Sequence, residues 1–302
     1  MSRAACAADA GRARLDVLSE VPASWARAVR RWAAMNRPRA ERHGCAIDRG
    51  DEYLLYQTLV GVWPLRPVDA AALGALRERA QAYLLKAVRE AKRLTSWVDP
   101  DEAYESALAR FIDLLLGVAE PNPFVRDLET WLPPVARLGC WNSLSQVVLK
   151  LTSPGVPDIY QGHETWQFNL VDPDNRRPVD FAALASDLDH VDALYAGDRL
   201  PADAVASLRD DQPSGRLKLL LTTRLLAVRR ARPLLFSQGT YVPLVASGPA
   251  ADHVVAFARV FDGQAVLVIA TRLLGGLAGA GPADPVGGVW HGTVVDQSLI
   301  HI

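Results

Sequence analysis

The sequence has 302 residues, and its 33 basic and 34 acidic side chains give a formal net charge of −1. That balance excludes binding of nucleic acid through a general positive charge. No apolar run approaches the ~18–20 residues that span a bilayer, and the N-terminus lacks the apolar stretch of a secretory signal. The three cysteines, Cys6, Cys45 and Cys140, show no metal or redox spacing. We therefore expect a cytoplasmic protein with reduced thiols, no bound metal and neither nucleic acid nor membrane as a partner.

Apolar periodicity predicts helices in the first third of the chain. Trp25, Val29 and Trp32 repeat at helical spacing within Val21–Met35, and the following "NRPRAERHG" is typical of a loop. The stretch "DEYLLYQTLVGVW", which begins at Asp51, is apolar on nearly every side, as in a buried helix.

The next helices carry clearer boundary signals. One apolar stripe predicts a long helix over Ala70–Thr95. Asp99, Pro100 and Glu102 match the N-cap, first and third helical positions of a capping box, and Gly117 marks the end of that helix.

Two more helices are expected over Phe124–Leu132 and Ser143–Leu151, the second capped by Asn142. After "SPG" the segment "VPDIY", Val156–Tyr160, has room only for a short strand, and a long polar loop follows it. The order of helix, turn, strand and loop is typical of a βα barrel, in which the loop after a strand lies at the active-site face.

The period changes to two after the helix in "RLKLLLTTRLLAVRRARP". The segments "TYVPLVA", "HVVAFARVF" and "QAVLVIATRLL" alternate and are separated by Gly and Pro, which predicts three strands. The C-terminal part is therefore expected to be a small antiparallel sheet domain.

Several segments, in a fixed order, resemble one family. "RARLDVLSEVPASW", "DEYLLYQTLVGVWP", "KAVREAKRLTSWVDPDEAYE", "NSLSQVVLKLTSPGVPDIYQG" and "LLAVRRARPLLFSQGTYVPL" are similar to the maltooligosyltrehalose synthases, which belong to the α-amylase superfamily, family 13 of the glycoside hydrolases. The core "PGVPDIYQG" alone indicates the superfamily, as its eighth barrel strand, and the continuation "VDPDNRRPVDF" points to the synthases.

The resemblance implies a defined reaction. These enzymes convert the reducing-end α-1,4 linkage of a maltooligosaccharide into an α,α-1,1 linkage, an intramolecular transglucosylation in trehalose biosynthesis that uses no cofactor. Retention requires a nucleophilic carboxylate and an acid/base carboxylate roughly 5–5.5 Å apart. The family's catalytic carboxylates precede the motifs found here, so no catalytic residue is expected in this chain.

The resemblance also implies a fold and a partner. We expect the C-terminal part of a (β/α)8 barrel, its last strand and helices, with a helical insertion and a small antiparallel β domain. The expected domains are an N-terminal remnant and linker (1–50), a helical subdomain (51–118), the end of the barrel (119–234) and an incomplete β domain (235–302). The chain would then be a truncated or split synthase that is inactive alone, with a separately encoded N-terminal half as a possible partner. The alternative is a non-catalytic α-glucan-binding remnant.

The candidate substrate-binding residues lie in and beside the polar loop. Tyr160 and Gln161 pair an aromatic ring for the apolar sugar face with an amide for hydroxyls, and packing of Tyr160 is the alternative. The loop also holds charged groups that either bind sugar or lock the loop through ion pairs. The loop candidates are Tyr160, Gln161, Glu164, Trp166, Asp172, Asp174, Asn175, Arg176 and Arg177. Weaker candidates, for which packing is an equal or better explanation, are Tyr53, Gln57, Lys92 and Trp97.

Overall fold

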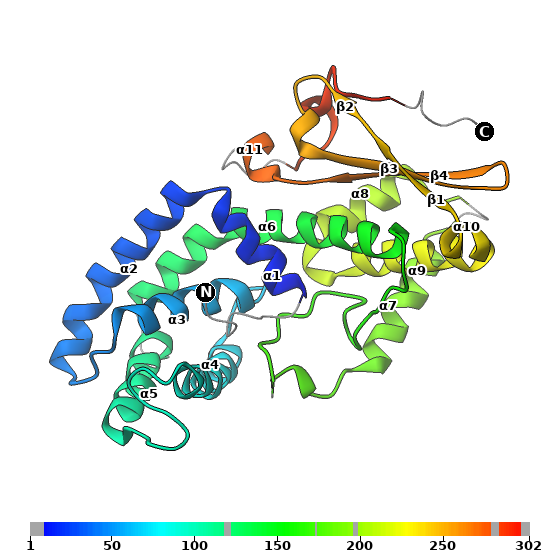
Figure 1. Cartoon of the computed structure of the whole chain (residues 1–302). Helices are drawn as coiled ribbons and strands as arrows, with labels where there is room; N and C mark the ends of the chain where they lie inside the picture. The colour runs from blue at the N-terminus through cyan, green and yellow to red at the C-terminus, as the bar shows by residue number, and fades with distance from the viewer. Residues whose placement is uncertain (1–8, 118–121, 173, 196–198, 279–283, 297–302) are drawn as a thin grey trace. The chain divides into compact units, whose positions relative to one another are not determined.

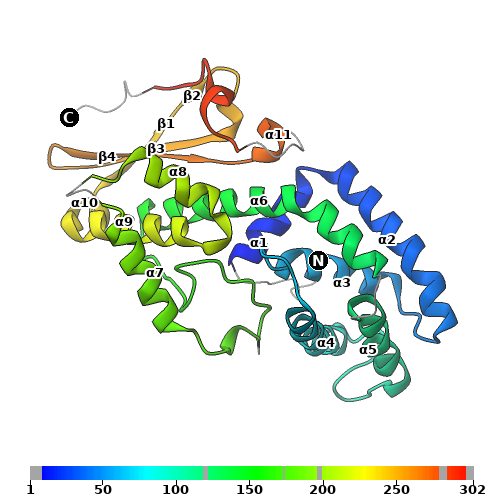
Figure 2. The ribbon, with the colours of Figure 1, turned by 180° about the vertical axis from the view of Figure 1, so that it is seen from behind.

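A computed structural model describes residues 9–117, 122–172, 174–195, 199–278 and 284–296 (Figures 1 and 2). The chain divides into two compact units. Unit 1 comprises Met1–Ala136 and Phe168–Arg177, and unit 2 comprises Arg137–Gln167 and Pro178–Ile302. The domain boundaries expected from the sequence stay a prediction.

Unit 1 is built from helices around an aromatic core. Trp32 lies edge-on to the rings of Tyr56 and Phe124, with centroids 5.3 and 5.6 Å away, and all three side chains are buried. Helices α4 and α5 pack against each other and run side by side in both views (Figures 1 and 2). The helices are α1 (Asp9–Asp16), α2 (Pro22–Arg42), α3 (Arg49–Val62), α4 (Ala70–Ala91), α5 (Glu102–Leu116) and the first part of α6 (Pro123–Thr152), with a 3-10 turn at Val17–Ser19.

Helix α2 extends seven residues beyond the predicted end at Met35 and takes in most of the predicted loop. It continues through Pro38, although proline removes one backbone hydrogen bond from a helix. Tertiary contacts hold this part: Ala40 is buried, and the buried Asn36 amide donates to the Tyr56 hydroxyl at 3.0 Å. Packing against residues distant in sequence therefore keeps α2 helical through a segment whose own residues are typical of a loop.

The start of α5 is also displaced from the prediction. Asp101, not Asp99, is the N-cap, and its carboxylate accepts from the Tyr104 N–H at 2.9 Å. Asp99 instead closes a turn by donating its N–H to the Ser96 hydroxyl at 2.9 Å. The predicted end of the helix at Gly117 is confirmed.

Helix α6 replaces the two helices predicted between Phe124 and Leu151. It runs unbroken from Pro123 to Thr152 through Pro133 and Pro134, so Asn142 caps no helix. An interior proline costs about 3 kcal/mol. The helix buries Leu132, Val135 and Leu138 around this point, and that apolar burial offsets the missing hydrogen bonds.

Unit 2 contains the remainder of α6 and a group of helices centred on α9. Helix α9 packs on α7 and α8 through the buried Val191, Leu208 and Leu220. The further helices are α7 (Phe181–Ala193), α8 (Ala202–Asp210), α9 (Arg216–Ala231), α10 (Pro233–Ser237) and α11 (Leu274–Ala278), with 3-10 turns at Gln212–Ser214, Ala251–His253 and Gly287–Trp290.

The predicted antiparallel strands of the C-terminal part are confirmed. Strands β1 (Thr240–Leu244), β3 (Val254–Phe261) and β4 (Gln264–Thr271) form a sheet in the order β1-β3-β4. Asp262 and Gly263, both with positive φ, close the β3–β4 hairpin, as a two-residue turn of this type requires. A second antiparallel pair joins β2 (Ala246–Ser247) to β5 (Val294–Val295).

The strand expected over Val156–Tyr160 is not formed. These residues lie in neither a helix nor a strand. A strand exists through hydrogen bonds to a neighbour, and the paired strands of the described residues are all antiparallel and lie C-terminal to residue 239. The chain is thus mostly helical with small antiparallel sheets, and its description as the end of a barrel stays a prediction.

Within the described residues, no helix is long and apolar enough to cross a membrane. Cys45 and Cys140 are buried, and Cys6 lies outside the described residues.

Candidate functional site

The polar loop after α6 is shared between the two units. Its segment 153–167 belongs to unit 2, whereas 168–177 belongs to unit 1. The candidate residues therefore form two separate groups, one around Tyr160 and one around Asp174. Each group is held by a long helix of its own unit.

The first group begins with a tight turn over Tyr160–His163. The His163 N–H donates to the Tyr160 carbonyl at 2.9 Å, and Gly162, at the third position, has φ 82°. Type II turns need this left-handed conformation there, which explains the "YQGH" pattern. A side chain at Gly162 would also lie 2.9 Å from the Gln167 amide nitrogen.

Trp166 anchors this group to the start of α9. Its indole N–H donates to the Gln212 carbonyl at 2.6 Å. The buried Lys218 ammonium donates to the Thr165 carbonyl at 3.1 Å and lies 5.5 Å from the Trp166 ring centroid. Trp166 therefore makes structural contacts with the start of α9, and its role in sugar binding stays a prediction.

Gly215 allows the loop to approach α9 this closely. It has φ 77°, and a Cβ placed there would lie 2.9 Å from the Thr165 Cβ. Any other residue would be strained by its backbone conformation and would collide with the loop. The glycine in "QPSG" thus allows the close contact between the start of α9 and the loop at Thr165 and Trp166.

The turn presents the groups suited to a neutral sugar. Tyr160 is 43% exposed, with its ring edge-on to His163 at 5.5 Å, and Gln161 is exposed. Glu164 differs, because its Oε2 is buried without a hydrogen-bond partner among the described residues. The exposed ring and amide can take the apolar face and the hydroxyls of a glucose unit, respectively.

The second group centres on Asp174, which is locked to α4. The Arg79 guanidinium donates to both Asp174 carboxylate oxygens, at 2.9 and 2.8 Å, and to the Phe168 carbonyl at 2.6 Å. The Leu170 N–H donates to Asp174 at 2.7 Å, and Arg177 lies 3.1 Å away. Burial opposes ionisation of Asp174, but these donors outweigh it and hold its pKa below the usual value.

Asp172 is held in a similar way. Lys86 of α4 donates to the Asp172 carbonyl at 2.7 Å, and Arg176 pairs with the Asp172 carboxylate. Arg177 also donates to the Asn169 side chain at 2.8 Å. The Asn175 side-chain oxygen is buried without a hydrogen-bond partner among the described residues. The charged groups of "DPDNRR" thus satisfy one another and the cations of α4, which matches the ion-pair explanation.

The two candidates on α3, Tyr53 and Gln57, are partly buried by packing. The Trp25 indole N–H donates to the Tyr53 hydroxyl at 2.9 Å, and the two ring centroids are 5.8 Å apart. Tyr53 is nevertheless 40% exposed, and Gln57 is partly exposed.

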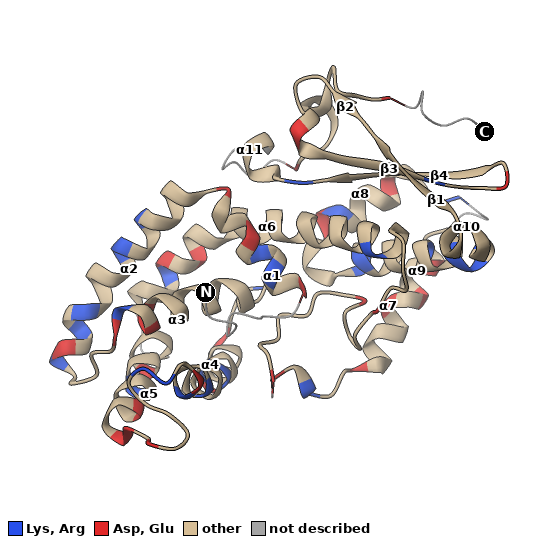
Figure 3. Cartoon of the chain, viewed as in Figure 1, with Lys and Arg blue, Asp and Glu red and all other residues tan. Residues whose placement is uncertain are grey.

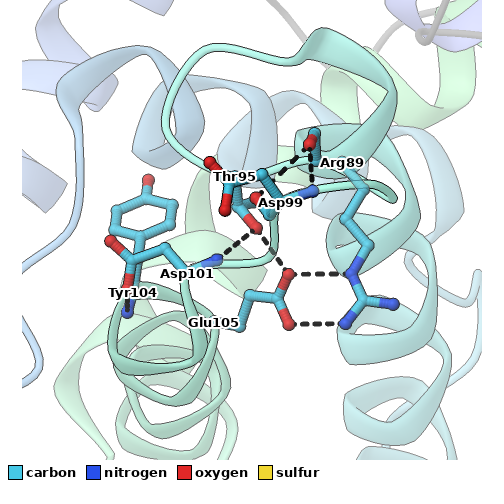
Figure 4. A network of polar contacts seen from close by, with 7 residues as sticks. Arg89, Thr95, Asp99, Asp101, Tyr104 and Glu105 are labelled. Atoms are coloured by element: carbon cyan, nitrogen blue, oxygen red, sulfur yellow. Dashed lines mark hydrogen bonds and ion pairs between the residues drawn. The ribbon is translucent and has the colours of Figure 1, made fainter.

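Trp97 belongs to the loop between α4 and α5, and a network of polar contacts around Glu105 holds this loop (Figure 4). Arg89 donates to both carboxylate oxygens of Glu105, at 2.8 and 2.6 Å, and Thr95 donates to Glu105 at 2.6 Å. The Arg89 guanidinium lies 4.8 Å from the Trp97 ring centroid, and Trp97 is 57% exposed. Lys92, exposed at the end of α4, has φ 53° and therefore ends the helix in a left-handed conformation.

The sequence did not reveal the cations that fix the loop. Arg79 and Lys86 are seven residues apart on α4, two turns along one face, and basic and acidic side chains are interspersed along this helix (Figure 3). Arg14, also missed, is buried, donates to the Val60 and Trp63 carbonyls and lies 4.1 Å from the Phe168 ring centroid. The i, i+7 spacing was the available signal for the α4 pair.

No family model matches the chain. A protein of Mycobacterium tuberculosis strain H37Rv named "Putative maltooligosyl trehalose synthase" is 37% identical over 261 residues, which cover 86% of this chain and 29% of that protein. Maltooligosyltrehalose synthase from Arthrobacter ramosus superposes with a TM-score of 0.72 at 37% identity, over 96% of this chain and 32% of that one. The chain is a homologue of part of the maltooligosyltrehalose synthases. A hypothetical maltooligosyl trehalose synthase of Sulfolobus tokodaii agrees, with a TM-score of 0.67 at 32% identity over 87% of this chain and 31% of that one.

This homologue spans about 29% of the length of the curated synthases it matches. The matched solved synthases are likewise covered over about a third of their chains. The comparisons thus confirm the family resemblance of the sequence and the partial coverage of the family.

Proposed function

We propose that the chain forms part of the α-glucan site of a maltooligosyltrehalose synthase, as its C-terminal portion. The whole enzyme would convert the reducing-end α-1,4 linkage of a maltooligosaccharide to α,α-1,1 by intramolecular transglucosylation. The observation that carries this proposal is the Tyr160–His163 turn of a synthase homologue, which holds a half-exposed ring beside an exposed amide. Cytoplasmic location stays a prediction of the sequence.

The isolated chain is proposed to lack transglucosylase activity. Retaining chemistry needs one carboxylate free to attack the sugar and another that carries a proton. Asp174 is engaged by Arg79 and Arg177, and Asp172 by Arg176. The lowered pKa of Asp174 also keeps it ionised, which is unsuited to a general acid.

Glucan binding is tested by calorimetric titration of the chain with maltoheptaose. We expect Tyr160→Ala to weaken binding about tenfold, since stacking on an aromatic ring contributes about 1.5 kcal/mol. Tyr241→Ala is the matched control, because Tyr241 is 42% exposed but lies on β1 against Phe257. Equal loss of affinity in both variants, or no binding by the unaltered chain, would contradict the proposal.

Activity is tested by chromatography after incubation with maltoheptaose. The chain alone should give no trehalose-ended product, and its mixture with the preceding two thirds of a homologous synthase should restore product. A product from the chain alone would overturn the proposed dependence on carboxylates outside it. Glucan binding without restored activity would favour the alternative of a non-catalytic α-glucan-binding protein.

A further inference from the structure

Unit 2 contains a cavity of about 600 Å³ that is open to solvent and lies between α6, α8, α9 and β4. Its lining is mostly apolar and includes Trp141, Leu220, Val205 and Ile269. Ala202 and Ala206 lie four residues apart on α8 and line the same wall, so their small side chains leave the space open. The volume falls within the ~300–1,000 Å³ of typical small-molecule sites.

The charges at this cavity have one sign. Arg209 of α8 and Arg224 of α9 line it, and the described residues that line it include no carboxylate and no lysine. Most of the β1-β3-β4 sheet is also uncharged (Figure 3). An apolar space whose charged lining side chains, among the described residues, are both guanidinium groups complements an apolar molecule with an anionic end.

Arg224 is the guanidinium better placed to receive that anion. Its partner Asp192 lies 3.4 Å away, and the two side chains are 47% and 61% exposed, so this ion pair contributes little. The Tyr195 ring lies 3.8 Å from the Arg224 guanidinium carbon and orients the group. Arg209 already contacts Asp210 at 2.9 Å and Asp284 at 3.5 Å.

We propose that this cavity binds an amphipathic carboxylate, with its apolar chain among α6, α8, α9 and β4 and its carboxylate on Arg224. The site is separate from the Tyr160 turn in its residues and does not depend on the proposed glucan function. Dodecanoate, below its micelle concentration, is the probe, and its neutral counterpart dodecanol tests the role of the charge.

Calorimetric titration of the full chain separates the parts of this proposal. Dodecanoate should bind with one-to-one stoichiometry. It should also bind about tenfold more tightly than dodecanol, because its carboxylate makes a charge-assisted hydrogen bond that the alcohol cannot make. Arg224→Gln should remove that preference and leave dodecanol binding unchanged. Ala206→Phe should abolish binding of both probes by filling the cavity.

Arg230→Gln is the matched control, because Arg230 lies on α9 but is not part of the cavity lining. It should bind dodecanoate like the unaltered chain. Thermal melts of each variant show whether a loss of binding reflects unfolding. No dodecanoate binding by the unaltered chain, or equal binding by the folded Ala206→Phe variant, would overturn the proposal.

Discussion

The lock between α4 and the loop residue Asp174 can be tested by removing its cation. Arg79→Met would delete two hydrogen bonds to Asp174 and one to the Phe168 carbonyl. The Arg79 and Asp174 side chains are only 18% and 9% exposed, so water can replace little of what is lost. Loss of one partner from a buried ion pair costs about 3–5 kcal/mol. Because Arg177 and the Leu170 N–H remain, we expect about 3 kcal/mol, the lower end of that range.

A double-mutant cycle measured by urea unfolding isolates this interaction. Arg79→Met, Asp174→Asn and their combination should give a coupling energy of about 1.5–3 kcal/mol. Arg77→Met is the control on the same helix, since Arg77 lies 3.5 Å from Asp113 and the two side chains are 34% and 50% exposed. That exposed pair should contribute less than about 1 kcal/mol. Equal effects of Arg79→Met and Arg77→Met on the free energy of unfolding would refute the reasoning.

Three further outcomes follow from the same structure. Gly215→Ala should lower the free energy of unfolding by about 1–3 kcal/mol, because residue 215 has a positive φ and a Cβ there would collide with the loop. Gly74→Ala, with open space around it inside α4, should instead raise the free energy of unfolding by about 0.5–1 kcal/mol. Similar urea midpoints for the two variants would contradict this. The folded pKa of Asp174 lies below its ordinary 3.8, so its stabilising contribution is complete above that pH and is lost as the pH falls through the folded pKa. As the pH is lowered, the free energy of unfolding of Asp174→Asn should therefore fall less steeply than that of the unaltered chain. Parallel curves of free energy against pH would count against this reasoning. Strand β4 is an edge strand that exposes 44% of Leu267, so the chain should self-associate with concentration and Leu267→Lys should reduce this; a monomer at every concentration in light scattering would exclude the idea.

Local pattern sufficed where each element carries its own signal. The alternation in "HVVAFARVF" and "QAVLVIATRLL" predicted strands that are now β3 and β4, because adjacent strands need only a short turn to pair. Gly117 ended α5 as expected. These features depend on neighbours in sequence, so the sequence displays them.

The failures have a common physical cause. Proline at 38, 133 and 134 signals a break locally, but packing against distant residues keeps α2 and α6 continuous. Likewise, Asp174 is paired with a cation 95 residues away in sequence, which no local pattern identifies. For the candidate site, the sequence alone indicated which residue types were suited to sugar and that the charged ones could form ion pairs. It did not indicate which residues of α4 and α9 contact the loop.

The proposed α-glucan ligand accounts for the different surroundings of the charged and the neutral side chains in the loop. An α-glucan is neutral, and a charged group that is already paired gains little by exchanging its partner for a sugar hydroxyl. The Asp and Arg side chains of 168–177 are paired with each other and with α4, and we expect these ion pairs to fix the backbone of the loop. Tyr160 and Gln161 are neutral, exposed and held by a turn whose geometry depends on Gly162. Selective loss of glucan affinity should therefore follow changes at the turn, whereas changes at Asp174 should act through stability.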